Sequence, residues 1–237
     1  MLCADPLENM PTVIAAPVPP TLAVAGSTSR FPIHRIYCIG RNYADHAKEM
    51  AAPVERTQPM FFMKPADAVV TDGADVRYPS ATEDLHHEVE MIVALASGGR
   101  DIPAGRALDC VFGYGVGLDL TRRDLQAAAK AKGHPWDVAK GFDHSAPAST
   151  IHPVSAIGHP RHASMSLSVN GDVRQQSDIA EMIFPVEAII HELSRLWELK
   201  AGDLIFTGTP AGVAALQRGD RFRAQLGDFA TLDGHIV

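Results

Sequence analysis

The sequence is poor in cysteine and has no net positive charge. Its three cysteines, Cys3, Cys38 and Cys110, include no Cys-x-x-Cys pair. An odd number of unpaired cysteines is typical of neither a disulfide framework nor a thiolate zinc site, so we expect a reducing, cytoplasmic location. Lys and Arg number 21 against 28 Asp and Glu, a formal net charge of −7. Without a broad basic face, we expect no nucleic-acid partner.

The chain also lacks an unbroken apolar run of membrane-spanning length. Residues 9–29 carry no charge, but four prolines interrupt them, and so we expect no membrane partner. No Lys or Arg precedes Arg30, which argues against a secretory signal. We interpret residues 1–30 as an extended N-terminal arm. Residues 31–237 show no composition shift that would divide them, which predicts one catalytic domain.

Strand signals outnumber helix signals along the chain. Apolar runs rich in β-branched residues predict strands at 35–40, 85–95, 110–120 and 164–169, and Asn170-Gly171 predicts a tight hairpin turn after the last. Helices are predicted at 43–50, at 122–133 and at 185–199; Thr121 and Asp124 have the spacing of a capping box for the second. No βαβ alternation is visible. The predicted fold class is α+β, mostly β, with few helices.

Two carboxylates two residues apart mark the first candidate site. Glu88 and Glu90 lie in a predicted strand, where residues two apart point to the same face. An edge strand with its polar face in water would explain them equally well, but the apolar run Met91–Leu95 favours an interior strand. Buried like charges repel, so a bound cation is the simplest way to neutralise the pair.

A third carboxylate ends a strand that has glycine on one face. Gly113, Gly115, Gly117 and Asp119 share that face of the predicted strand. Interior glycines indicate that something else occupies the space, either a closely packed backbone or a ligand. Two Glu and one Asp form an all-oxygen ligand set suited to Mg²⁺ or Mn²⁺, with Ca²⁺ possible in principle. The glycine spacing is not that of a dinucleotide fingerprint, and we expect no organic cofactor.

A histidine and a glutamate three residues apart form a candidate base. His46 and Glu49 would share one face of the helix predicted at 43–50. A carboxylate that holds one imidazole nitrogen leaves the other free to take a proton from water. The alternative is a solvated surface helix, which the residues by themselves favour.

Several further polar residues stand beside apolar or turn residues. Lys64, Arg123, Gln126 and Lys140 could together hold a dianionic substrate near a metal, with Arg suited to a carboxylate and Lys to a developing negative oxygen.

These segments, in this order, resemble the fumarylacetoacetate hydrolase family. The matching stretches are Gly40–His46, Phe62–Pro65, His87–Glu90, Gly117–Asp124, Lys140 and Thr207–Pro210. The resemblance implies a mixed β-sheet roll, a homodimer, and Mg²⁺ or Mn²⁺ held by Glu88, Glu90 and Asp119. It implies that His46 and Glu49 activate water from a short lid helix and that Lys140 is catalytic. It assigns substrate contacts to Lys64, Arg123, Gln126 and Thr209.

The implied activity is hydrolysis of a carbon–carbon bond in a 2,4-dioxo acid. The stretches 99–103, 121–126 and 133–147 most resemble family members that split fumarylpyruvate into fumarate and pyruvate in gentisate-type aromatic catabolism. Fumarylpyruvate has a second carboxylate, for which Arg41, Arg122 and Arg123 are the candidate partners; Arg41 could instead brace the lid. Acylpyruvate hydrolysis and oxaloacetate decarboxylation or tautomerisation are the alternatives, and a non-catalytic metal-stabilised binding protein is a remote one.

Overall fold

The computed structural model describes residues 12–50, 53–71 and 73–237. The first part of the predicted arm, with Cys3, lies outside the described residues, as do Ala51 and Ala52 behind the predicted lid helix. The described chain is a mostly β, α+β fold, which confirms the predicted class. None of its helices has both the length and the apolar character needed to cross a membrane.

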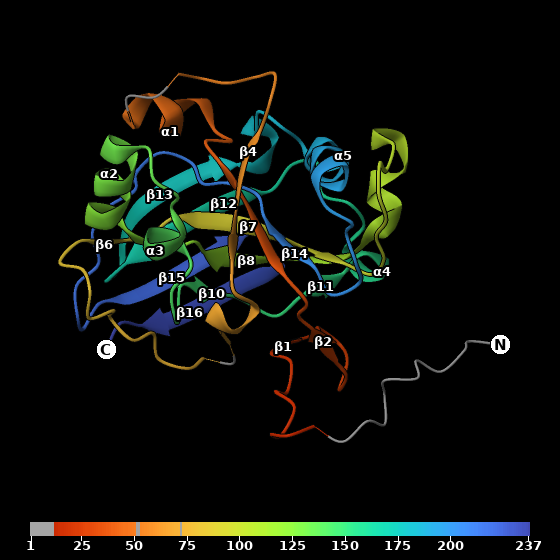
Figure 1. The fold of residues 1–237 in the computed structure, drawn as a ribbon, viewed down its shortest axis with the longest axis horizontal. Coiled ribbons are helices and arrows are strands. Elements are labelled where there is room, and N and C mark those ends of the chain that lie inside the picture. The colour runs from red at the N-terminus through yellow and green to blue at the C-terminus, as the bar shows by residue number, and fades with distance from the viewer. Residues whose placement is uncertain (1–11, 51–52, 72) are drawn as a thin grey trace.

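A six-stranded mixed sheet forms the centre of the molecule (Figure 1). Its spatial order is β11-β8-β7-β14-β3-β4, and β14 with β3 is its parallel pair. The strands are β3 (Ile36–Gly40), β4 (Met60–Lys64), β7 (Val89–Leu95), β8 (Val111–Leu118), β11 (His152–Pro153) and β14 (Leu204–Phe206). Every residue of β7 is buried, as its apolar sequence predicts for a strand covered on both faces.

A four-stranded antiparallel sheet packs on one face of the central sheet. Its order is β13-β12-β15-β16, with β12 (Ser164–Val169), β13 (Asp172–Asp178), β15 (Arg221–Leu226) and β16 (Ala230–His235). Alternate residues of the two sheets meet in the larger apolar core, where Met91 and Val93 of β7 join Leu167 and Ala224. The opposite face of β7, with Ile92 and Ala94, belongs to a smaller core.

Helices lie around the two sheets. Figure 1 shows α1 and α2 at the upper left, and α4 and α5 toward the right. The α-helices are α1 (Ala44–Glu49), α2 (Arg123–Lys132), α3 (Asp137–Lys140), α4 (Val154–Ile157) and α5 (Val186–Leu196), and the 3₁₀ segments are η1 (Ala66–Ala68), η2 (Ala104–Cys110) and η3 (Ile179–Glu181). The amphipathic α5 buries Ile189, Ile190 and Leu193 against the larger core, as its spacing predicts.

Three short strand pairs complete the fold. They are β1 (Thr21–Ala23) with β2 (Arg30–Pro32), β5 (Val69–Val70) with β10 (Ala146–Pro147), and β6 (Leu85–His86) with β9 (Thr121–Arg122). Residues 12–19 of the arm are exposed and contain no strand or helix, whereas Leu22 is fully buried. Because β2 spans residue 31, the division between arm and catalytic domain remains a proposal.

Most of the predicted elements are present, with shorter bounds. Asn170 and Gly171 both have positive φ, 54° and 93°, which confirms the hairpin turn. The predicted capping box at Thr121 is wrong. Arg122 is the N-cap of α2, and the Asp124 carboxylate accepts hydrogen bonds from the Thr82 hydroxyl and the Glu83 amide. Asp124 therefore ties α2 to the preceding loop.

The glycine face of β8 accommodates backbone. A Cβ at Gly113 would lie 2.3 Å from the carbonyl oxygen of His152, and one at Gly117 would lie 2.7 Å from that of Pro147. The segment from Pro147 to Pro153 thus packs directly on the strand. Of the two explanations that the glycines allow, close packing of backbone is the correct one here.

Candidate active site

The polar residues of the candidate site gather at one end of the central sheet, where five of its strands begin or end. The chain leaves this end from β3, β8 and β14 and enters it at β4 and β7, as the pairing registers require. Asp119 follows β8, Glu88 precedes β7 with Glu90 inside it, and Thr209 follows β14. A cleft opens there, lined also by residues of α1 and α2.

Three buried carboxylates lie together at this cleft, which Glu88 and Glu90 line and behind which Asp119 lies. One oxygen from each of Glu88, Glu90 and Asp119 lies within 4.8 Å of the others. Their side chains project from the face of the sheet that carries Ile92 and the β8 glycines, so the period-two pattern of both strands brings them together.

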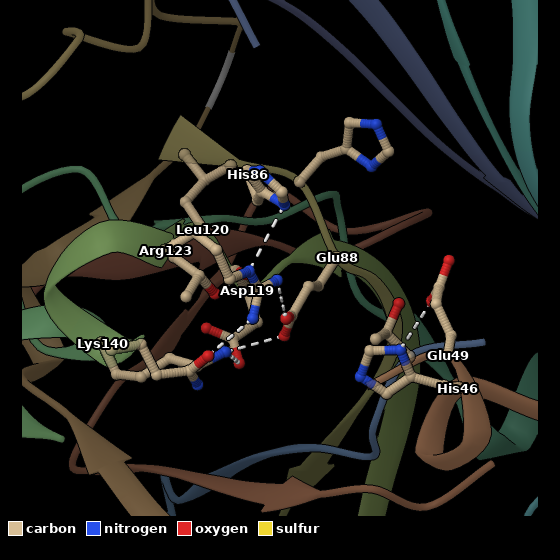
Figure 2. A network of polar contacts seen from close by, with 12 residues as sticks. His46, Glu49, His86, Glu88, Asp119, Leu120, Arg123 and Lys140 are labelled. Carbon is tan, nitrogen blue, oxygen red and sulfur yellow. Dashed lines mark hydrogen bonds and ion pairs between the residues drawn. The ribbon is translucent and has the colours of Figure 1, made fainter. Parts of the chain in front are cut away.

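Cations hold two of the three carboxylates (Figure 2). The Lys140 ammonium is 2.7 Å from Glu88 and 2.6 Å from Asp119, and Arg123 donates to Glu88 at 2.6 Å. Burial opposes the charged form of Glu88, but Lys140 and Arg123 outweigh it and hold the pKa of Glu88 well below its usual range. Burial likewise opposes the charged form of Lys140, whose pKa is nevertheless raised by Asp119 and Glu88.

Lys64 lies beneath the cluster. Its ammonium is 2.7 Å from Asp119, donates to the carbonyl of Leu120 at 3.1 Å, and also donates to the carbonyl of Lys140. The side chain is fully buried and does not line the cleft. This placement suits a group that orients Asp119 and Lys140, and it does not bring Lys64 into the cleft as a substrate contact.

Glu90 has no cationic partner among the residues that the structure describes. Its carboxylate accepts one hydrogen bond, from the Gly208 amide at 2.7 Å. Burial raises the pKa of Glu90 well above its usual range, and the negative charges of Asp119 and Glu88 raise it further. Three hard oxygen donors in a dry recess, one of them uncompensated, suit a divalent cation such as Mg²⁺ or Mn²⁺.

His46 and Glu49 form the predicted pair at the rim of the cleft. His46 Nδ1 donates to Glu49 Oε2 at 3.2 Å, and the other Glu49 oxygen accepts from the Gly212 amide at 3.0 Å. His46 is 6% exposed and lines the cleft, so the alternative of a solvated surface helix is wrong. With Nδ1 as the donor, Nε2 is the nitrogen left free to accept a proton.

A strained turn presents Arg41 to the cleft. Arg41 has a φ of 61°, a conformation that side-chain-bearing residues rarely adopt and that tends to occur at functional sites. The neighbouring Asn42 fixes this turn by donating to the carbonyls of Thr207 and Phe184 and accepting from the Phe184 amide. Arg41 makes no ion pair with any described residue.

The cleft also contains residues that the sequence analysis missed. Lys130 lies with its ammonium 5.0 Å from the centre of the Trp136 ring, and Trp136 packs on Phe62. Lys130 had no signal beyond the usual positive charge near a helix end. Its pKa is lowered to about 8, first by partial burial of the ammonium and then by the positive charges of Arg123 and Arg41. Lys140 acts in the same direction and Glu88 against it.

The structure thus brings most of the predicted site residues into one cleft. The predicted residues among those lining it are Arg41, His46, Glu88, Glu90, Arg123, Gln126, Lys140 and Thr209. Gln126 accepts a hydrogen bond from Arg123 at 2.7 Å. Arg122 lies apart: it packs 4.3 Å from the centre of the Phe142 ring and donates to the carbonyl of Val138.

An oxygen-ligand metal set beside a His–Glu pair, at one end of a mixed sheet, defines an enzyme that combines a cation with acid–base chemistry. The family model described as fumarylacetoacetate (FAA) hydrolase, C-terminal, matches residues 35–237. The chain belongs to this family, which confirms the resemblance.

Solved and curated relatives differ in the activity that their names state. A crystal structure of fumarylpyruvate hydrolase from Pseudomonas aeruginosa in complex with Mn²⁺ and pyruvate is 46% identical, with a TM-score of 0.93 over 96% of this chain and 99% of that chain. An oxaloacetate tautomerase of Escherichia coli is 40% identical over 90% of this chain and 94% of its own length. A mitochondrial oxaloacetate tautomerase of Rattus norvegicus is 43% identical over 80% and 85%.

Proposed function

We propose that this protein is a metal-dependent hydrolase that cleaves fumarylpyruvate to fumarate and pyruvate. The observation that carries the proposal is the His46–Glu49 pair, held at the rim of the cleft that Glu88 and Glu90 of the carboxylate cluster line. Such a pair is suited to activating the water that hydrolysis consumes. The similarity to the fumarylpyruvate hydrolase of P. aeruginosa extends over nearly the full length of both chains and supports the same substrate.

Glu88, Glu90 and Asp119 would hold the cation, Mg²⁺ or Mn²⁺. A bound divalent cation supplies Lewis-acid stabilisation of negative charge that develops on an oxygen of a 2-oxo acid. The neighbouring structure contains Mn²⁺ and pyruvate, the product that the pyruvyl half of fumarylpyruvate would become.

His46 is the proposed general base. Its Nε2 takes a proton from the attacking water, while Glu49 accepts a hydrogen bond from the Nδ1–H group and stabilises the imidazolium. The Gly212 amide fixes Glu49, so the orientation of the imidazole depends on the loop after β14 as well as on α1. The water attacks the 4-oxo carbon, and the bond between this carbon and the pyruvyl methylene then breaks. The electron pair of that bond leaves with the pyruvyl unit as an enolate, which takes up the proton held by His46 to give pyruvate.

Lys140 and Thr209 are the proposed donors to the reacting substrate. The Lys140 ammonium holds its proton between Glu88 and Asp119 and borders the cleft, where it stabilises negative charge on a substrate oxygen. Gln126 and Arg123, which are hydrogen-bonded to each other, form the adjoining wall and favour an anionic substrate.

Charge balance favours a substrate with two carboxylates, which fumarylpyruvate and oxaloacetate both have and acetylpyruvate lacks. Lys64, Arg123 and Lys140 are engaged with Glu88 and Asp119, whereas Arg41 and Lys130 line the cleft with no acidic partner among the residues described. A carboxylate at the far end of fumarylpyruvate would meet these two cations. We assign the distal carboxylate to Arg41 and Lys130, in place of Arg122.

Oxaloacetate tautomerisation is the second candidate. The E. coli and rat relatives carry that activity in their names. Keto–enol exchange needs proton transfer at one carbon and no attacking water, and His46 with Lys140 could provide both the base and the donor. The same cleft therefore supports either reaction chemically.

A parallel assay tests the proposal. Fumarylpyruvate, acetylpyruvate and oxaloacetate are supplied to Mn²⁺-loaded protein and to protein stripped with EDTA. We expect the highest kcat/KM for fumarylpyruvate, with loss of turnover after stripping. Faster turnover of oxaloacetate, with fumarylpyruvate left uncleaved, would replace the proposal with the tautomerase function.

A further inference from the structure

Gln175 is a buried polar residue in a strand that otherwise faces solvent. It is 1% exposed, whereas Val173 on the same strand is 64% exposed. Residues two apart in a regular strand share a face, but Leu167 pairs with Gln175 and Ser168 with Val173, so Arg174 is an extra residue. This β-bulge in β13 turns Gln175 toward Thr209 and Pro210 in the loop after β14. It leaves the apolar Val173 exposed to solvent.

All four hydrogen-bonding positions of the Gln175 amide are used. Its oxygen accepts from His87 Nδ1 at 2.9 Å and from the Val89 amide at 3.0 Å. Its nitrogen donates to Thr209 Oγ1 at 2.8 Å and to the carbonyl of Pro210 at 2.9 Å. A backbone amide only donates and a carbonyl only accepts, so Val89 and Pro210 together fix which end of the Gln175 amide is which.

This arrangement determines what the Thr209 hydroxyl can do. Thr209 is buried, lines the cleft, and accepts the Gln175 N–H on its oxygen. Among the described residues, the Thr209 hydroxyl donates no hydrogen bond. Because Gln175 occupies one lone pair of the Thr209 oxygen, the hydroxyl proton is free to be donated to a group in the cleft.

We propose that Gln175 is a positioning residue that sets the Thr209 hydroxyl as a hydrogen-bond donor to an anionic oxygen of the substrate. The inference rests on the proposed function insofar as the cleft is the active site. It does not depend on which 2-oxo acid reacts. The same side chain holds the Val89 amide, between two carboxylates of the cluster, so a purely structural role through Glu88 and Glu90 is the competing explanation.

A polarity swap at Gln175 distinguishes the two roles. Gln175→Glu keeps the oxygen that accepts hydrogen bonds from His87 and Val89. It replaces the nitrogen that donates to Thr209 with an acceptor, so the Thr209 hydroxyl would donate to the new carboxylate and no longer to the substrate. We expect Gln175→Glu and Thr209→Val each to lower kcat/KM about ten- to hundredfold, the loss for one hydrogen bond to a charged oxygen. The double variant should be no worse than the poorer single variant, because both changes remove the same donor.

Three further variants and measurements complete the experiment. Thr209→Ser keeps the hydroxyl and should retain kcat/KM within about threefold, a difference of less than 1 kcal/mol. Gln176→Glu, an exposed neighbour on β13, controls for the added charge and should match the unmodified protein. Mn²⁺ affinity, measured by calorimetry, should stay unchanged in Gln175→Glu. The substrate is whichever of fumarylpyruvate and oxaloacetate the unmodified protein turns over, so failure of the fumarylpyruvate proposal leaves this test intact.

The opposing results are equally definite. Losses that multiply in the double variant would mean that Gln175 acts independently of Thr209. A more than tenfold weaker Mn²⁺ affinity in Gln175→Glu would mean that Gln175 acts by holding Val89 between Glu88 and Glu90, and not by orienting Thr209. If Gln175→Glu fails to fold, Thr209→Val still decides, because unchanged kcat/KM in that variant would leave no donor for Gln175 to position.

Discussion

Lys130 gives the sharpest test of the proposed substrate, because its charge can be removed by pH as well as by substitution. Its ammonium lies over the Trp136 ring in the cleft, and its pKa is lowered from the ordinary 10.5 to about 8. Lys130 is otherwise an exposed residue, so solvent screens part of this effect and the midpoint should lie between these two values.

The expected magnitude follows from one charge-assisted contact. Loss of a hydrogen bond to a charged group costs about 1.5 to 3 kcal/mol, or roughly ten- to hundredfold in kcat/KM. Below its pKa, Lys130 is protonated and, under the proposed assignment, would bind the distal carboxylate of fumarylpyruvate. Above it, the amine is neutral and the contact weakens, so kcat/KM for fumarylpyruvate should fall with rising pH toward a limit set by that factor. Acetylpyruvate lacks the distal carboxylate and should show no such fall.

The assay compares the two substrates from pH 6.5 to 10 in the unmodified protein and in two variants. In Lys130→Met, kcat/KM for fumarylpyruvate should no longer exceed that for acetylpyruvate by this factor at neutral pH. The fall in kcat/KM at alkaline pH that is specific to fumarylpyruvate should also disappear. Lys132→Met is the matched control, since Lys132 is exposed on the same helix and lies outside the cleft. Parallel losses on both substrates in Lys130→Met would refute the assignment of Lys130 to the distal carboxylate.

The remaining predictions concern the metal, the base and the fold. Metal-free protein should lose stability as pH rises above the ordinary carboxyl pKa, because folded Glu90 has a raised pKa and retains a proton that the unfolded chain releases. Glu90→Gln should abolish most of this loss in urea unfolding with EDTA; an unchanged pH dependence would contradict the assignment. His46→Ala should lower kcat by about 10² to 10⁴ with unchanged Mn²⁺ affinity, whereas lost metal with normal kcat would make His46 a ligand. Gly113→Ala should cost about 1 to 3 kcal/mol in unfolding free energy, because its Cβ meets the His152 carbonyl. Gly105→Ala, with open space around its Cβ, should cost less than about 1 kcal/mol; equal losses would contradict the packing argument.

The parts of the site that follow a local period could be predicted from the sequence. Glu88 and Glu90 share a face because strand residues alternate, and His46 and Glu49 meet because helical residues three apart are neighbours. The strands and the hairpin at Asn170 depend on similarly local signals. These features need no knowledge of what packs on them.

Features that depend on distant segments could not be predicted in the same way. Lys64 is adjacent to apolar residues in sequence, yet only the folded sheet places its ammonium beneath Asp119. Gln175 lies in a polar stretch and is turned inward by a bulge that no local pattern announces. Thr121 and Asp124 have the spacing of a capping box. Asp124 instead accepts hydrogen bonds from Thr82 and Glu83, which lie 42 and 41 residues earlier in the chain. A tertiary hydrogen bond replaced the local one.

The distribution of charge around the three carboxylates bears on how one site can serve two reactions. The cations Lys140, Arg123 and Lys64 contact Glu88 and Asp119, and their contacts leave Glu90 as the carboxylate that needs a cation from outside the chain. Three cations against three carboxylates leave the cluster formally neutral, so a bound divalent ion would make it positive and suited to the carboxylate of whichever 2-oxo acid binds. Under the proposed assignment, selection between fumarylpyruvate and oxaloacetate depends on Arg41 and Lys130, which line the same cleft and have no acidic partner among the described residues. Both substrates are dianions, but the second carboxylate of oxaloacetate lies closer to its pyruvyl end. Contact of the two cations with a more distant carboxylate would therefore favour the longer dianion.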